Sequence, residues 1–102
     1  MAVLEILSIL WLVGTALTIV YSILITAANI INFLRGKAHL IRGKHRIGFS
    51  LQEKLKNGKY HTVYGVFDTK TEDLISGKRE VSEKRDSELA DYHAKEELVI
   101  YS

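Results

Sequence analysis

The chain of 102 residues contains no cysteine. Disulfide bridges and thiolate metal sites are therefore excluded. The lack of cysteine does not indicate whether the protein works in an oxidising or a reducing compartment. Several catalytic motifs are also missing, namely a G-x-S-x-G nucleophile elbow, a phosphate-binding glycine loop and an H-E-x-x-H helix. We therefore expect a protein that is not an enzyme and that binds no cofactor.

Metal ligands are scarce as well. Two of the four histidines, His61 and His93, could meet in space beside Glu96 or Glu97. Two histidines and one carboxylate can bind a metal, but this spacing is generic, and a histidine on the polar side of a strand is more simply a surface residue. The sequence therefore predicts no metal site.

Residues 2–34 lack proline and basic residues, and Glu5 is their only charge. At roughly 1.5 Å per residue a helix of this length reaches about 50 Å, against a hydrocarbon core of about 30 Å. This pattern predicts a single transmembrane helix over residues 1–34. A cleaved signal peptide is less consistent with it, because Glu5 stands where a basic region is required and the apolar run is too long.

A basic segment follows the apolar stretch. Residues 35–46 carry five basic residues and no acid, which predicts a juxtamembrane linker that sets topology and attracts lipid head groups: Arg35, Lys37, Arg42, Lys44 and Arg46. The positive-inside rule then places the N-terminus outside the cell (inner) membrane and the C-terminal domain in the cytoplasm. Residues 47–102 hold 9 basic and 11 acidic residues, so nucleic-acid binding is not expected.

Small and polar residues recur every three or four positions within the apolar stretch. On a continuous helix they fall on one side, where small residues allow close helix packing and polar groups can bond across the contact. The pattern predicts a helix-packing stripe with these members: Gly14, Thr18, Ser22, Thr26 and Asn29.

From Ile47 the hydrophobic period changes from helical to alternating. Asn57-Gly58 between two alternating runs is a strong hairpin signal. With these two as the loop residues, Leu51 faces Tyr64 across the hairpin. A third strand over 74–81, a helix capped by Asp86 or Ser87 and a last strand over 98–101 complete the pattern. Residues 47–102 are thus expected to form a small α+β domain with an antiparallel sheet, in the order β-β-β-α-β.

These features together favour a single-pass membrane protein. Its function is expected to be that of a non-enzymatic interaction or accessory subunit, which associates with itself or with a larger membrane complex through the helix stripe. An oligomeric pore-forming or membrane-permeabilising protein is the alternative, in which several copies turn their stripes inward.

The opening Met-Ala-Val-Leu-Glu, followed by a long apolar segment and a small β-rich domain, resembles the start of mature type IV pilins. The resemblance covers about the first 30 residues. It implies a filament subunit in which Glu5 helps neighbouring subunits to find their register. A pilin-like filament subunit is therefore a second alternative, and its domain would lie outside the cell.

Overall fold

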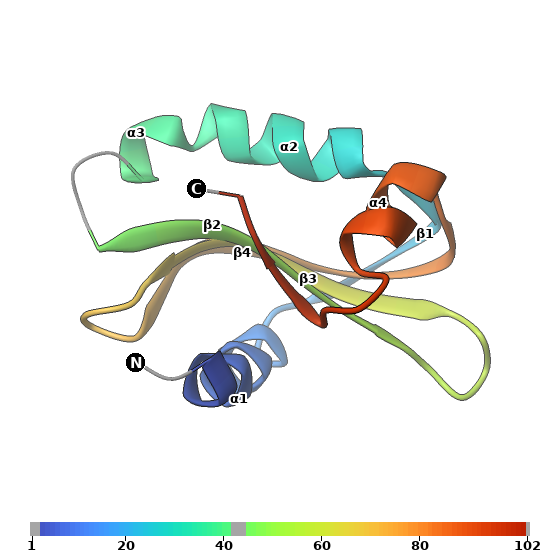
Figure 1. Ribbon diagram of the computed structural model, residues 1–102, viewed down its shortest axis with the longest axis horizontal. Helices are drawn as coiled ribbons and strands as arrows, with labels where there is room; N and C mark the ends of the chain where they lie inside the picture. Colours follow the sequence, from blue (N-terminus) through green and yellow to red (C-terminus); the bar gives the residue numbers. More distant parts are fainter. Residues whose placement is uncertain (1–2, 42–44, 102) are drawn as a thin grey trace.

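The computed structural model describes residues 3–41 and 45–101, which form a five-stranded mixed sheet with helices on both faces (Figure 1). The strands lie in the order β1-β4-β3-β2-β5, and β1 runs parallel to β4 whereas the other neighbours are antiparallel. The elements, in chain order, are α1 (Val3–Gly14), β1 (Ile19–Ile25), α2 (Ala27–Gly36), α3 (Ala38–Ile41), β2 (Arg46–Lys54), β3 (Tyr60–Asp68), β4 (Asp73–Arg85), α4 (Ser87–Tyr92) and β5 (Leu98–Ile100).

The first 34 residues do not form one helix, so the predicted fold class is wrong. Helix α1 ends at Gly14, and the chain then enters strand β1. The run Ile-Val-Tyr-Ser-Ile-Leu-Ile in β1 is rich in β-branched and aromatic side chains, which favour strands. Thr26 ends the strand and caps α2, because its hydroxyl accepts a hydrogen bond from the Asn29 N–H at 3.0 Å.

No helix within the described residues is long and apolar enough to cross a membrane. Helix α1 has 12 residues and therefore spans about 18 Å, well short of a hydrocarbon core of about 30 Å. The expectations of a membrane protein, of an inner-membrane location and of an outside N-terminus rested on a single long helix and are corrected by this finding.

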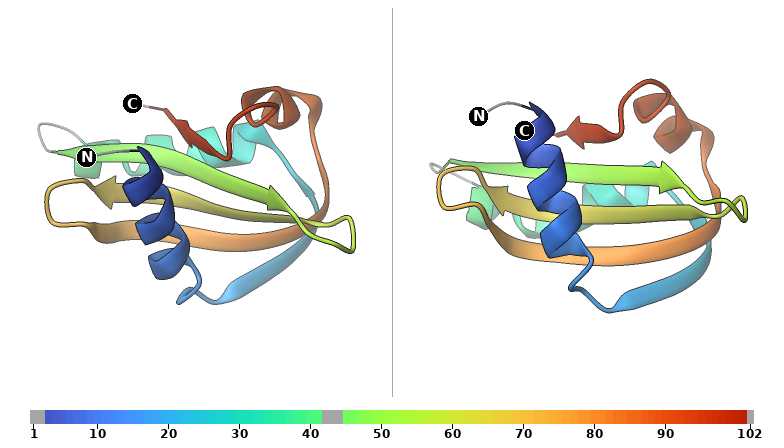
Figure 2. Two further views of the ribbon diagram at one scale, coloured as in Figure 1. Left: turned by 60° about the horizontal axis from the view of Figure 1, so that its bottom comes forward. Right: turned by 90° about the horizontal axis from the view of Figure 1, so that it is seen from below.

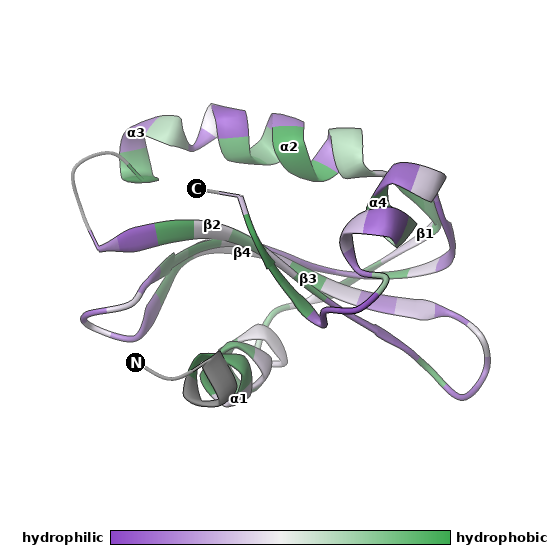
Figure 3. Ribbon diagram, viewed as in Figure 1, coloured by the Kyte–Doolittle hydropathy of each residue, from purple (hydrophilic) through white to green (hydrophobic). Residues whose placement is uncertain are grey.

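The sheet separates two hydrophobic clusters (Figures 1 and 2). Helix α1 packs on one face, where Ile6 and Leu10 meet Phe49, Leu51, Val63 and Phe67. Helices α2 and α4 cover part of the other face, where the buried residues are Ile25, Ala27, Ile30, Leu34, Tyr64, Val66 and Leu89. Hydrophobic residues run along α1 and the middle strands (Figure 3). The apolar N-terminal stretch thus supplies residues to both clusters.

The expected hairpin is present, but its register differs by one residue. Leu51 pairs with Val63, and Ser50 pairs with Tyr64. Leu55 and Lys59 close the loop through a hydrogen bond of 2.7 Å, so the connection is longer than the two residues expected. Gly58 sits at φ 87°, a conformation that favours glycine. Because side chains alternate, this shift puts Tyr64 and Leu51 on opposite faces of the sheet.

Candidate functional site

Strand β1 is an edge strand, so it forms one border of the sheet. It exposes apolar side chains on both of its faces. Its four most exposed residues are Val20, Tyr21, Ile23 and Leu24, with 53%, 73%, 70% and 45% of their surface accessible. The strand has seven residues and carries no charge. It pairs with β4 on one side only, and within the described residues no strand lies beyond it (Figure 2).

The Ser22 hydroxyl at the middle of β1 is already bonded inside the molecule. The Ser22 hydroxyl donates to the Glu80 carboxylate at 2.5 Å, on the face of the sheet that α2 partly covers. The Tyr64 hydroxyl donates to the other Glu80 oxygen at a longer 3.5 Å. Burial, together with the negative charge of Glu80, raises the pKa of Tyr64 to about 12. Ser22 therefore does not need water or an external partner for its hydroxyl.

An open hollow of about 280 Å³ continues the exposed apolar surface onto the face that carries α1. Tyr21 of β1 and Val81 of β4 line it together with Leu55 and Lys59 from the β2–β3 connection. Helix α1 covers the middle of this face and leaves this end uncovered (Figure 2). Asn57, His61 and Arg79 also line the hollow, so the surface beside β1 is partly apolar and partly polar.

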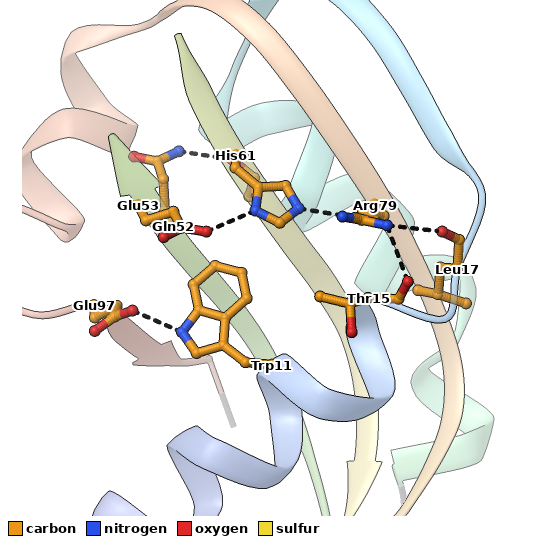
Figure 4. Close-up of polar contacts among 9 residues, drawn as sticks. Trp11, Thr15, Leu17, Gln52, Glu53, His61, Arg79 and Glu97 are labelled. Carbon is orange, nitrogen blue, oxygen red and sulfur yellow. Dashed lines mark hydrogen bonds and ion pairs between the residues drawn. The ribbon is translucent and has the colours of Figure 1, made fainter. Parts of the chain in front are cut away.

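Arg79 fixes the start of β1. It lies opposite Ile19 in the parallel ladder, and its guanidinium donates to the main-chain oxygens of Thr15 and Leu17, at 3.0 and 3.4 Å. These two residues belong to the connection between α1 and β1. Arg79 also donates through Nε to His61 Nε2 at 2.9 Å (Figure 4). The charge-assisted bonds hold the connection against the sheet.

His61 lies at the centre of this hydrogen-bonded network (Figure 4). Because Arg79 donates to Nε2, the ring hydrogen is assigned to Nδ1, which donates to the Glu53 carboxylate at 2.8 Å. The Trp11 ring stacks on the imidazole at 5.2 Å between centroids, and its indole N–H donates to Glu97 at 2.6 Å. The network joins α1 to β2, β3 and β4.

Asp86 fixes the other end of β1. Its main-chain N–H donates to the Ile25 oxygen at 3.1 Å. Its carboxylate accepts from the Leu89 N–H at 3.0 Å as the N-cap of α4, and from the N–H of Ala27, the first residue of α2, at 3.2 Å. Strand β1 is therefore held at both ends while its outer side stays bare.

A serine–histidine pair lies in the interior near the opposite border of the sheet. The Ser50 hydroxyl is 2.7 Å from His93 Nε2 and 2.7 Å from the Tyr101 hydroxyl, and His93 Nδ1 donates to the Glu96 oxygen at 3.0 Å. Burial lowers the pKa of His93 and raises that of Tyr101. Ser50 has no exposed surface, so its hydroxyl is closed to a substrate in this conformation. The cluster joins α4 and the segment after β5 to β2.

The residues of the predicted helix stripe are distributed over different elements. Gly14 ends α1, Thr18 precedes β1, Ser22 lies within β1, Thr26 caps α2, and Asn29 lies exposed on α2. Their common spacing places them on one side only in an unbroken helix. The structure therefore does not bring them together as one packing surface, although Gly14 packs closely on Val63.

The predicted basic segment is divided in the same way. Arg35 is exposed in the last turn of α2, and Lys37 follows as its C-cap. Arg46 begins β2 and pairs with Asp68 at 3.4 Å. Hydrogen bonds from the Thr71 and Lys70 N–H groups, together with Arg46, lower the pKa of Asp68. Arg42 and Lys44 lie outside the described residues.

The two histidines that were weighed as metal ligands, His61 and His93, lie apart. His61 stacks on Trp11 of α1, whereas His93 contacts Ser50 from the opposite side of the sheet. Among the described residues no group of three or more candidate ligands is close enough to hold a metal ion.

The candidate surface that the sequence alone does not reveal is the β1 border. Its local signal is the run of β-branched residues between Thr18 and Thr26, which total hydrophobicity assigns to a helix. Comparisons with protein-family models, with curated proteins and with solved structures find no match to this chain.

Proposed function

We propose that this protein is a non-enzymatic interaction protein that binds another polypeptide along strand β1. The observation that carries the proposal is the bare, uncharged, apolar border of the sheet at residues 19–25. An outer strand presents unpaired N–H and C=O groups, which an added strand can satisfy by continuing the ladder. The exposed side chains supply apolar contact on both faces of such a strand.

The surroundings of β1 support binding in preference to chemistry. Edge strands are commonly protected against pairing with other chains by charged residues, by proline or by being short. Strand β1 has none of these features. The serine–histidine pair is buried beneath α4, and the His61 network is occupied by its own partners. The hollow beside β1 is lined by Tyr21, Leu55 and Val81 and adds area for a partner's side chains.

The membrane-based interpretations are not carried forward. Docking through a transmembrane stripe, a pore lined by such stripes and a pilin-like filament all require the long N-terminal helix, which is divided into α1, β1 and α2. The lipid bilayer as a partner was inferred from the same helix. Association with another protein chain remains, and we assign it to β1.

A photo-crosslinking amino acid tests the proposal in cells of the organism that encodes the protein. It replaces Tyr21 on β1 in one variant and Tyr92 on α4 in the control, since both tyrosines are exposed. We expect a protein adduct of defined mass from position 21 only. We also expect its loss when Ile23→Lys is added, because a charge on the strand opposes pairing.

Equal adducts from positions 21 and 92, or none from position 21, would overturn the assignment of β1 as the binding surface. Circular dichroism of each variant verifies that it is folded. An adduct that survives Ile23→Lys would also count against strand pairing.

A further inference from the structure

We propose that the strand that binds β1 is β1 of a second copy of this chain, in antiparallel orientation about a two-fold axis at Ser22. The inference rests on the proposed function, since it names the partner of the same surface. It follows from the sequence of the strand, from its charges and from the space around it.

The strand is complementary to itself. With Ser22 opposite Ser22 of the second copy, Tyr21 faces Ile23 and Val20 faces Leu24. Ile19 and Ile25 complete the alignment, so all seven residues are paired and every pair outside the centre is apolar. Shifting the axis to Tyr21 would leave Leu24 and Ile25 without partners. A two-fold axis also pairs one surface with itself, which is the commonest arrangement of oligomers.

Ser22, at the centre of the paired strands, can be buried in the contact. Ser22 is small, and its hydroxyl is bonded to Glu80 of its own copy, so pairing leaves no new polar group unsatisfied there. A free hydroxyl at this position would oppose an apolar contact. The internal bond to Glu80 removes that cost.

Charges do not drive the pairing, and β1 itself carries none that would oppose it. The strand has none, and the nearest charged row lies on β4, where residues of both signs, such as Arg79, Glu80 and Lys84, alternate with others. In the paired sheets the two β4 strands would be three strand spacings apart, about 14 Å. The Glu80 carboxylates lie nearer the axis than this, because each accepts a hydrogen bond from Ser22 of its own copy, so they add a repulsion that salt weakens. A partner selected by opposite charge would require charged residues on β1.

The space beside β1 is open. Helix α1 lies over one face of the sheet and α2 over the other, and neither extends past the outer side of β1 (Figure 2). Pairing would join two five-stranded sheets into one continuous sheet. A single strand pair buries less surface than a standard interface of about 1,600 Å², as weak and transient contacts do, so we expect a dimer that dissociates on dilution.

Because the chain has no cysteine, introduced cysteines give a specific test. In the Ser22→Cys variant the two sulfur-bearing residues face each other with Cα atoms about 4.5–5.5 Å apart, within the range for a disulfide. In the control Ile19→Cys they are six residues apart along the strands, or about 20 Å. Under mild oxidation we expect a disulfide-linked dimer from Ser22→Cys and monomer from Ile19→Cys.

Light scattering of the unmodified chain is the second measurement, and it does not depend on folding of a variant. We expect the fraction of dimer to increase with protein concentration. A monomer at all concentrations, or equal crosslinking of both cysteine variants, would overturn the second copy as partner. If the Tyr21 crosslinker then captures a different protein, the proposed function stands and only this inference fails.

Discussion

The two borders of the sheet differ in length, charge and protection. Strand β5 has three residues, follows Glu96 and Glu97, and is fixed to β2 by ladder bonds and by the buried Ser50–His93–Tyr101 cluster. Strand β1 has seven residues, no charge and four exposed apolar side chains. Short strands and nearby charges are common means of preventing unwanted pairing. One border thus offers a short strand beside charged residues, whereas the other offers a longer, uncharged strand with exposed apolar side chains.

The largest expected effect comes from a charge placed on β1, compared with the same charge placed on β5. Ile23 on β1 and Ile100 on β5 are both exposed, at 70% and 51%. We expect Ile23→Lys to raise the dissociation constant of the dimer by roughly 10- to 100-fold, because a charge must be desolvated in the strand pair. Sedimentation of both variants measures this.

Ile100→Lys is the matched control and should leave the dimer unchanged. Weakening of the dimer by both substitutions to the same degree would remove the distinction between the borders.

The second effect concerns α1, whose end positions the start of β1. A Cβ at Gly14 would lie 2.9 Å from both Val63 methyl groups, and Val63 is fully buried. We expect Gly14→Ala to lower the free energy of unfolding by about 1–3 kcal/mol, the usual cost of overpacking. Chemical denaturation provides the measurement.

Gly36 in α2 is the comparison, since no atom lies within 4 Å of a Cβ built there. Gly36→Ala should be neutral or stabilise by up to about 1 kcal/mol. Equal losses at both glycines would show that α1 does not pack as described.

Arg79 gives a third, smaller effect on the β1 side. Arg79→Ala removes the bonds to His61 and to the oxygens of Thr15 and Leu17, and we expect a loss of about 1–3 kcal/mol in unfolding free energy. The exposed Lys84 of the same strand is the control, where Lys84→Ala should change the unfolding free energy by less than about 0.5 kcal/mol. Thermal unfolding measures both variants, and indistinguishable values would count against the network as the anchor of β1.

The smallest effect is a pH dependence on the β5 side. Burial lowers the pKa of His93 in the folded state below its ordinary value of 6.5, so the unfolded chain binds the proton more readily. Stability from this group is complete above pH 6.5 and falls as the pH drops below it. The slope is at most about 1.4 kcal/mol per pH unit.

Denaturation at several pH values between neutral and mildly acidic conditions measures that slope. His93→Asn should flatten the profile in this range, whereas His39→Asn on exposed α3 should leave it intact. An unchanged profile in His93→Asn would assign the pH dependence elsewhere.

Much of the second half of the chain was predictable from local signals. The Asn57-Gly58 turn, the cap at Asp86 and the strand at Leu98 lie where the sequence indicates. The hairpin register was wrong by one residue, because the loop length depends on the bond between Leu55 and Lys59 and not on the turn dipeptide alone.

The first half shows where such signals conflict. Total hydrophobicity favours a membrane helix over residues 2–34, yet Gly14, Thr26 and the β-branched run between them indicate an interruption. Residues 19–25 form a strand and not part of a helix because they pair with β4, which lies sixty residues later in the chain. The exposed border at β1 could not be predicted without this long-range pairing, because the same residues on a helix form a different surface.

Amide hydrogen exchange at several protein concentrations tests the central claim most directly. In a dimer joined through β1, the amides of residues 19–25 that point away from β4 gain hydrogen-bond partners, while those of residues 98–100 do not. We predict that protection in β1 increases with concentration and that protection in β5 stays constant. Exchange in β1 that does not depend on concentration would contradict pairing of β1 with a second copy.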